Sequence, residues 1–106
     1  MPLELYFLPS YERCVKKLGS GERKIAGLAV SALKSYFELG LPFSGNPYVF
    51  KTHGRSWRLV FEKLRAHIWE AYIEGRARIL AREEEGQHFL VFAGNHDQVR
   101  QFLKTA

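Results

Sequence analysis

The chain has 106 residues, the length of one small domain with a single hydrophobic core and one working surface. Hydrophobic residues make up 46% and charged residues 25%, a globular composition that excludes intrinsic disorder. Lysine and arginine number 16 against 11 acidic residues, and the net charge of +5 favours a polyanionic or acidic partner over a neutral metabolite.

The sequence carries no sign of a membrane or secreted protein. No apolar run approaches the roughly 20 residues that a membrane span needs, and Glu4 stands where a secretory signal would carry positive charge. The single cysteine, Cys14, excludes an internal disulfide framework, fits a reducing compartment and lies at an apolar helix position typical of a core residue. We therefore expect a cytoplasmic protein with no membrane partner.

The first forty residues predict a strand followed by a helical hairpin. Alternation over residues 3–8 indicates a short strand, and Ser10 then has the position of a helix N-cap. Apolar residues recur at helical spacing over residues 11–18, and Ser20 opens a second helix with a continuous apolar stripe.

The middle of the chain leaves two alternatives open. Ser, Gly, Asn and Pro residues between Phe43 and Pro47 predict a loop. Trp57, Leu59 and Phe61 then alternate with polar neighbours, which indicates either a strand or an extended approach to the sheet.

Three strands are predicted in the last half. A three-residue loop that pairs Ile73 with Ala77 is preferred to a two-residue turn, because it separates apolar from charged residues. The next hairpin turns through residues 83–87 and pairs Ala81 with Phe89. The apolar face then consists of Trp69, Ala71, Ile73, Ala77, Ile79, Ala81, Phe89, Val91 and Ala93.

By elimination the opposite face carries the polar residues Glu70, Tyr72, Arg78, Arg82 and His88. Antiparallel pairing brings the end of the last strand beside the start of the one before it. We therefore expect Asn95 and His96 to lie close to Tyr72, Arg76 and Arg78.

These segments resemble the RelE/ParE toxins. The stretch from Glu62 to Leu80 is similar to their K-L-x-x-x-x-W-E-x-R-x-x-x-x-R-I-L segment, and Gly94-Asn95-His96-Asp97-Gln98-Val99 is similar to their closing strand with its H-D-x-V ending. The similarity covers about the last forty residues and extends to the rest by element order. It implies a single α+β domain over residues 1–106: an N-terminal strand, a two-helix hairpin, an antiparallel sheet with helices packed on one face, and a short C-terminal helix.

The resemblance also implies a function. In the nuclease members the concave sheet face binds messenger RNA and cleaves it, commonly on the ribosome, and a cognate antitoxin protein holds the toxin inactive. The family's basic and acid-base positions correspond to Lys63, Arg65 and Glu70 on one strand, to Arg76 and Arg78 on the next, and to His96 at the end.

A metal-independent ribonuclease needs few groups, because the RNA 2′-hydroxyl can act as nucleophile. Arg76 and Arg78 suit phosphate clamps, His96 suits an acid or base, and Glu70 or Tyr72 suits the partner role. Tyr72, Phe92 or Trp57 suits base stacking, while further RNA contacts are expected from Lys63, Arg65, Arg82 and His88. No cofactor or metal is expected, since the spacing of His53, His67, His88 and His96 lacks a metal-ligand pattern.

Other readings stay open. Tyr72 stands where the family segment has arginine, which gives weight to a ParE-like toxin that binds DNA gyrase without nuclease chemistry. A noncatalytic RNA- or protein-binding module is a third possibility. Locally, Arg76, Arg78 and Arg82 also suit a solvated sheet face, and Asn95 and Gln98 have the spacing of a helix cap.

Overall fold

A computed structural model describes residues 4–39, 47–52, 54–65, 67–73 and 76–105. Within them the chain forms an α+β domain of three helices and a six-stranded sheet. In chain order the elements are β1 (Glu4–Phe7), α1 (Pro9–Lys17), α2 (Ser20–Glu38), β2 (Tyr48–Thr52), β3 (Arg55–Arg65), β4 (Ile68–Ile73), β5 (Arg78–Glu84), β6 (Gln87–Gly94) and α3 (His96–Thr105).

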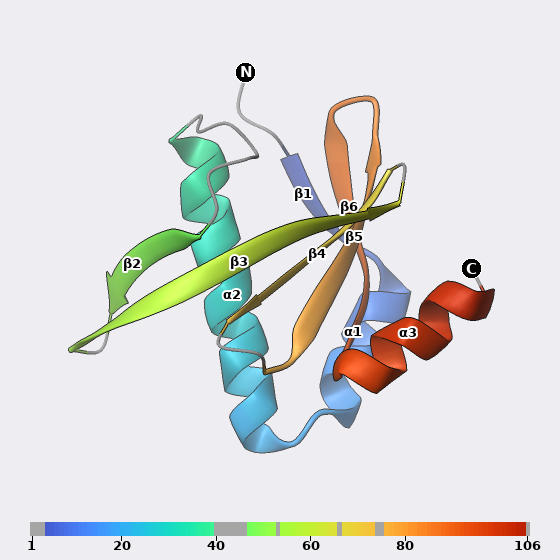
Figure 1. Ribbon diagram of the computed structural model, residues 1–106, viewed down its shortest axis with the longest axis horizontal. Helices are drawn as coiled ribbons and strands as arrows, with labels where there is room; N and C mark the ends of the chain where they lie inside the picture. Colours follow the sequence, from blue (N-terminus) through green and yellow to red (C-terminus); the bar gives the residue numbers. More distant parts are fainter. Residues whose placement is uncertain (1–3, 40–46, 53, 66, 74–75, 106) are drawn as a thin grey trace.

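The sheet has the order β1-β6-β5-β4-β3-β2. The expected antiparallel sheet is therefore mixed, because β1 pairs in parallel with β6 while every other described pair is antiparallel. The α1–α2 hairpin covers one face, and α3 packs on the other against β5 and β6 (Figure 1). The expectation that helices pack on one face thus holds for the hairpin alone. None of the described helices is long and apolar enough to cross a membrane.

The two helices of the hairpin form where the sequence predicts them, but α1 begins at an earlier residue than expected. The first helix begins at Pro9, whose fixed φ and missing N–H suit the first helical position. Ser10 is therefore inside α1 and is not the expected cap. Its hydroxyl instead donates to the Val91 carbonyl at 2.8 Å, which ties α1 to β6. The second helix begins at Ser20 as expected.

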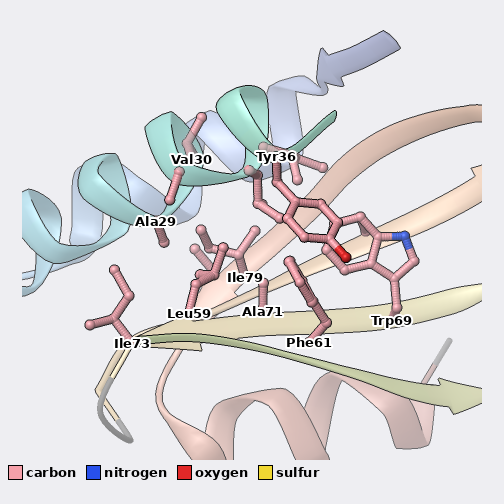
Figure 2. Close-up of a cluster of buried hydrophobic side chains, with 14 of the residues drawn as sticks. Ala29, Val30, Tyr36, Leu59, Phe61, Trp69, Ala71, Ile73 and Ile79 are labelled. Atoms are coloured by element: carbon pink, nitrogen blue, oxygen red, sulfur yellow. The ribbon is translucent and has the colours of Figure 1, made fainter. Parts of the chain in front are cut away.

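The main core lies between α2 and the sheet. Ala29 and Tyr36 of α2 point toward β3 and β4, where Phe61 and Trp69 are both buried (Figure 2). Burying each large apolar side chain stabilises the fold by about 1.5–3 kcal/mol. Cys14 packs partly buried against this core, as expected.

The segment around Trp57, which the sequence left open as a strand or an extended approach to the sheet, is a strand. Tyr48 pairs with Leu59 in the β2–β3 hairpin, so Trp57–Glu62 lies in a true strand. Gly54 takes a φ of 76° in the turn, a value that a glycine adopts without strain.

The strand registers decide which side chains share a face. The predicted β4–β5 register is confirmed, because Tyr72 pairs with Arg78. The predicted β5–β6 register is wrong: Glu84 pairs with Gln87 across a two-residue turn with positive φ at Glu85 and Gly86, so Ala81 pairs with Leu90 in place of Phe89. A bulge beyond this pair then shifts the register, and Leu80 pairs with Phe92. The shift moves Phe89 and Val91 off the predicted apolar face.

Candidate functional site

The face of the sheet opposite α1 and α2, here called the outer face, brings together part of the predicted constellation. Glu70 and Tyr72 of β4 and Arg78 of β5 lie on it, with Tyr72 directly opposite Arg78. Glu70 and Tyr72 share the face because positions two apart on a strand point the same way. Arg78 shares it because paired residues on neighbouring strands point to the same side.

Arg78 is held by both neighbours. One terminal nitrogen of its guanidinium donates to a Glu70 carboxylate oxygen at 2.7 Å, and its Cζ lies 4.0 Å from the centre of the Tyr72 ring. The Arg78 and Glu70 side chains are 14% and 5% exposed. The Nε of Arg78 is buried and has no hydrogen-bond partner among the described residues. A guanidinium in this setting is fixed in place and retains unused donor capacity.

Burial raises the pKa of the Glu70 carboxyl above its usual value. The charge of Arg78 and, more weakly, that of His96 act in the opposite direction, while Glu62 adds to the rise. Glu62 of β3 lies directly opposite Glu70 and is exposed. The sequence reasoning missed Glu62 as a site residue, although strand alternation through Trp57 and Phe61 places it on the outer face.

The first turn of α3 begins beside Arg78. Gly94 pairs with Arg78 and is buried, and a Cβ there would lie 2.7 Å from Oε1 of Gln98. The Asn95 and Gln98 side chains each accept the other's backbone N–H at 2.8 Å, so the local reading of these residues as a cap is confirmed. His96 is the first residue of α3 and is exposed.

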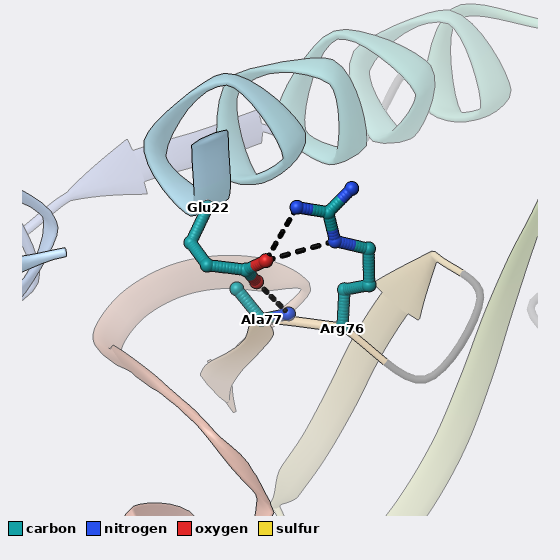
Figure 3. Close-up of polar contacts among 3 residues, drawn as sticks. All are labelled: Glu22, Arg76 and Ala77. Atoms are coloured by element: carbon teal, nitrogen blue, oxygen red, sulfur yellow. Dashed lines mark hydrogen bonds and ion pairs between the residues drawn. The ribbon is translucent and has the colours of Figure 1, made fainter. Parts of the chain in front are cut away.

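Arg76 does not join this group. Its Nε donates to Oε1 of Glu22 at 2.8 Å, and the second carboxylate oxygen accepts the Ala77 N–H at 2.7 Å (Figure 3). Burial acts to raise the pKa of Glu22, but the hydrogen bonds from Arg76 and Ala77 and the charge of Arg76 lower it below its usual value. Arg76 thus fastens β5 to α2, and the expectation that it lies beside Arg78 and His96 is wrong.

His88 is also misplaced by the sequence reasoning. The two-residue β5–β6 turn pairs His88 with Glu83 and places it on the helix side, where it is 1% exposed, stacks on Phe37 and accepts a hydrogen bond from Trp69 Nε1 at Nδ1 over 2.9 Å. Burial lowers its pKa, with Glu83 acting in the opposite direction. A side chain enclosed in this way cannot contact RNA.

The other predicted RNA contacts are scattered. Lys63 pairs with Trp69 and so lies on the helix side, exposed at the end of β3. Arg65 donates to the Leu103 carbonyl at 2.6 Å and fastens the end of α3. Arg82 remains exposed on the outer face, 3.0 Å from a Glu84 carboxylate oxygen.

Of the predicted stacking residues, Tyr72 alone lies in the site. Phe92 stacks on Phe102 of α3 at 4.6 Å, and Trp57 faces α2. The site therefore comprises Glu62, Glu70, Tyr72, Arg78 and His96, which supply a fixed cation and exposed acid-base groups. No cluster of three or more potential metal ligands occurs in the part of the chain that is described.

Comparison of the chain with protein-family models, with curated proteins and with solved structures finds no match.

Proposed function

We propose that this chain is a toxin of the RelE/ParE superfamily, the toxin component of a toxin-antitoxin system, and that it cleaves messenger RNA without a metal ion. Its element order and the segments around Trp69 and His96 are similar to that family. The observation that carries the proposal is the site itself: a fixed arginine beside an exposed histidine and an exposed carboxylate.

In the proposed reaction Arg78 stabilises charge on the scissile phosphate. A guanidinium keeps its charge at every physiological pH and meets phosphate oxygens with paired donors. Glu70 and Tyr72 hold it by an ion pair and by ring contact, so little reorganisation is needed when charge develops. Glu70 is thus a positioning residue.

His96 and Glu62 supply the proton transfers. One of them takes the proton of the RNA 2′-hydroxyl, whose oxygen attacks the adjacent phosphorus. The other gives a proton to the departing 5′-oxygen, which leaves a 2′,3′-cyclic phosphate and a 5′-hydroxyl end. Glu62 pairs with Glu70, and His96 begins α3 shortly after Gly94, which pairs with Arg78. Both side chains are exposed to a substrate.

The partners follow from charge and from the family resemblance. A net charge of +5 favours RNA, and we expect a cognate antitoxin to inhibit the toxin. Its action on messenger RNA, on the ribosome or free, places the proposed activity in the cytoplasm.

A second candidate is a ParE-like toxin that binds a protein such as DNA gyrase and performs no cleavage. The pairing of Arg78 with Glu70 favours it, since a neutralised arginine attracts a phosphate less strongly. A noncatalytic module of the same fold would also retain the basic residues and need no histidine.

The test is to induce the chain in bacteria and map new 5′ ends in messenger RNA, beside His96→Ala and Glu62→Gln variants. The matched control is His67→Asn, because His67 is exposed at the β3–β4 turn with φ 71°, which asparagine tolerates. We expect new 5′-hydroxyl ends with wild type and control and at least a tenfold loss in each site variant. Growth arrest with intact messages would overturn the nuclease proposal in favour of the second candidate.

A further inference from the structure

The outer face continues past the proposed reaction site onto the β2–β3 hairpin. In Figure 1 this hairpin reaches sideways beyond α2, away from α3. Its outer side carries Val49 and Lys51 of β2 opposite Arg58 and Ser56 of β3, since these residues pair in register. All four are exposed, so this end of the face is open.

The hairpin lies in line with Arg78. Val60 pairs with Tyr72, and Tyr72 pairs with Arg78, so one cross-strand row joins β3 to β5. Arg58 is two residues beyond Val60 on the same side. Strand spacing and rise put its Cα about 12 Å from that of Arg78, and Lys51 lies one further strand away.

The chemistry along this row suits a single nucleic-acid strand. Lys51, Arg58 and Arg78 alternate with the surfaces of Val49, Val60 and Tyr72, which offer flat or apolar contact between cations. Val49 is 56% exposed, an unusual position for a large apolar side chain in a strand. Cations track phosphates while apolar and aromatic surfaces take bases, irrespective of sequence.

We propose that the outer side of the β2–β3 hairpin is a second RNA subsite, in which Arg58 and Lys51 bind phosphates of nucleotides flanking the scissile bond. The proposal rests on the proposed function, because Arg78 marks where the scissile phosphate lies. The preferred ligand is an unpaired RNA strand. A duplex would meet a narrow hairpin at one edge and leave Val49 and Val60 without a base to contact.

The test measures binding of fluorescein-labelled RNA with 2′-O-methyl groups, which block cleavage, in two lengths: a dinucleotide and a decanucleotide. A decanucleotide spans at least about 30 Å and reaches Lys51 from Arg78, whereas a dinucleotide does not. The variant is Lys51→Ala with Arg58→Ala. The control is Lys16→Ala with Lys17→Ala, which removes two exposed charges from the last turn of α1.

We expect wild type and control to bind the decanucleotide at least tenfold more tightly than the dinucleotide, and the hairpin variant to lose most of that difference. For the hairpin variant, the slope of log affinity against log salt concentration should be smaller in magnitude by about two. Equal decanucleotide affinity in all three proteins would overturn the subsite while leaving the cleavage proposal standing. Absence of RNA binding by wild type would overturn both proposals.

Discussion

Two arginines two residues apart are used in opposite ways. Arg76 pairs with Glu22 where the side chains are 44% and 37% exposed, and it joins β5 to α2. Arg78 pairs with Glu70 where they are 14% and 5% exposed, on the other side of the sheet. The distances within the two pairs are alike, at 2.6 Å and 2.7 Å, so the pairs differ in their exposure to solvent and not in their geometry. An exposed pair tolerates the loss of one partner, whereas a buried carboxylate needs its cation.

The largest expected effect tests the buried pair. Arg78→Ala leaves the Glu70 carboxylate enclosed without its cation, and we expect the free energy of unfolding to fall by about 3–5 kcal/mol in urea titration. Replacing both residues, as in Glu70→Gln with Arg78→Met, should recover most of that loss because no buried charge remains. A double variant as unstable as Arg78→Ala would show that the pair contributes through packing and not through charge.

His88 is another buried titratable group, and its Nε2 lies 3.9 Å from a carboxylate oxygen of Glu83. Because burial lowers its pKa, the unfolded chain binds a proton more readily than the folded one. Stability should therefore fall as the pH drops below the ordinary histidine pKa of 6.5, by up to about 1.4 kcal/mol per pH unit. Thermal unfolding from pH 7.5 to 5 should show this decline in wild type, and a much flatter profile in His88→Gln.

The smallest effect belongs to the exposed pair. Arg76→Ala should lower the free energy of unfolding by less than about 1 kcal/mol, because water replaces much of the contact. RNA cleavage should change little, since Arg76 lies away from the outer face. A loss of cleavage equal to that of Arg78→Ala, in a protein that remains folded, would contradict this separation of roles.

Sequence reasoning placed some of these residues correctly for a physical reason. Apolar residues alternate with others from Trp69 to Ile73 and from Ala77 to Ile79, so only one hairpin register buries the apolar set. Glu70, Tyr72 and Arg78 were therefore predicted on one face, as observed. The run Phe89–Ala93 is apolar throughout, so alternation gives no register there, and neither the two-residue turn nor the bulge between the Leu80 and Ala81 pairs was predicted.

Arg76 and Glu62 were missed for other reasons. Arg76 precedes β5, so strand alternation does not govern its direction, and its partner Glu22 is 54 residues earlier in the chain. Glu62 lies in a segment that the sequence left open as a strand or an extended approach. Its position opposite Glu70 is set only when β3 pairs with β4. Both positions depend on long-range pairing, which local patterns do not report.

The parallel pairing of β1 with β6 joins Glu4 to Gln87 across most of the chain. During synthesis β1 leaves the ribosome before β6 and can pair with it only after β6 has followed. Leu5, which packs against the core from β1, likewise lacks Leu90 and Ala93 until then. Closing so long a loop is slow relative to local hairpins. Between the synthesis of β6 and its pairing with β1, β6 is therefore an unpaired edge of the sheet, to which another strand can add.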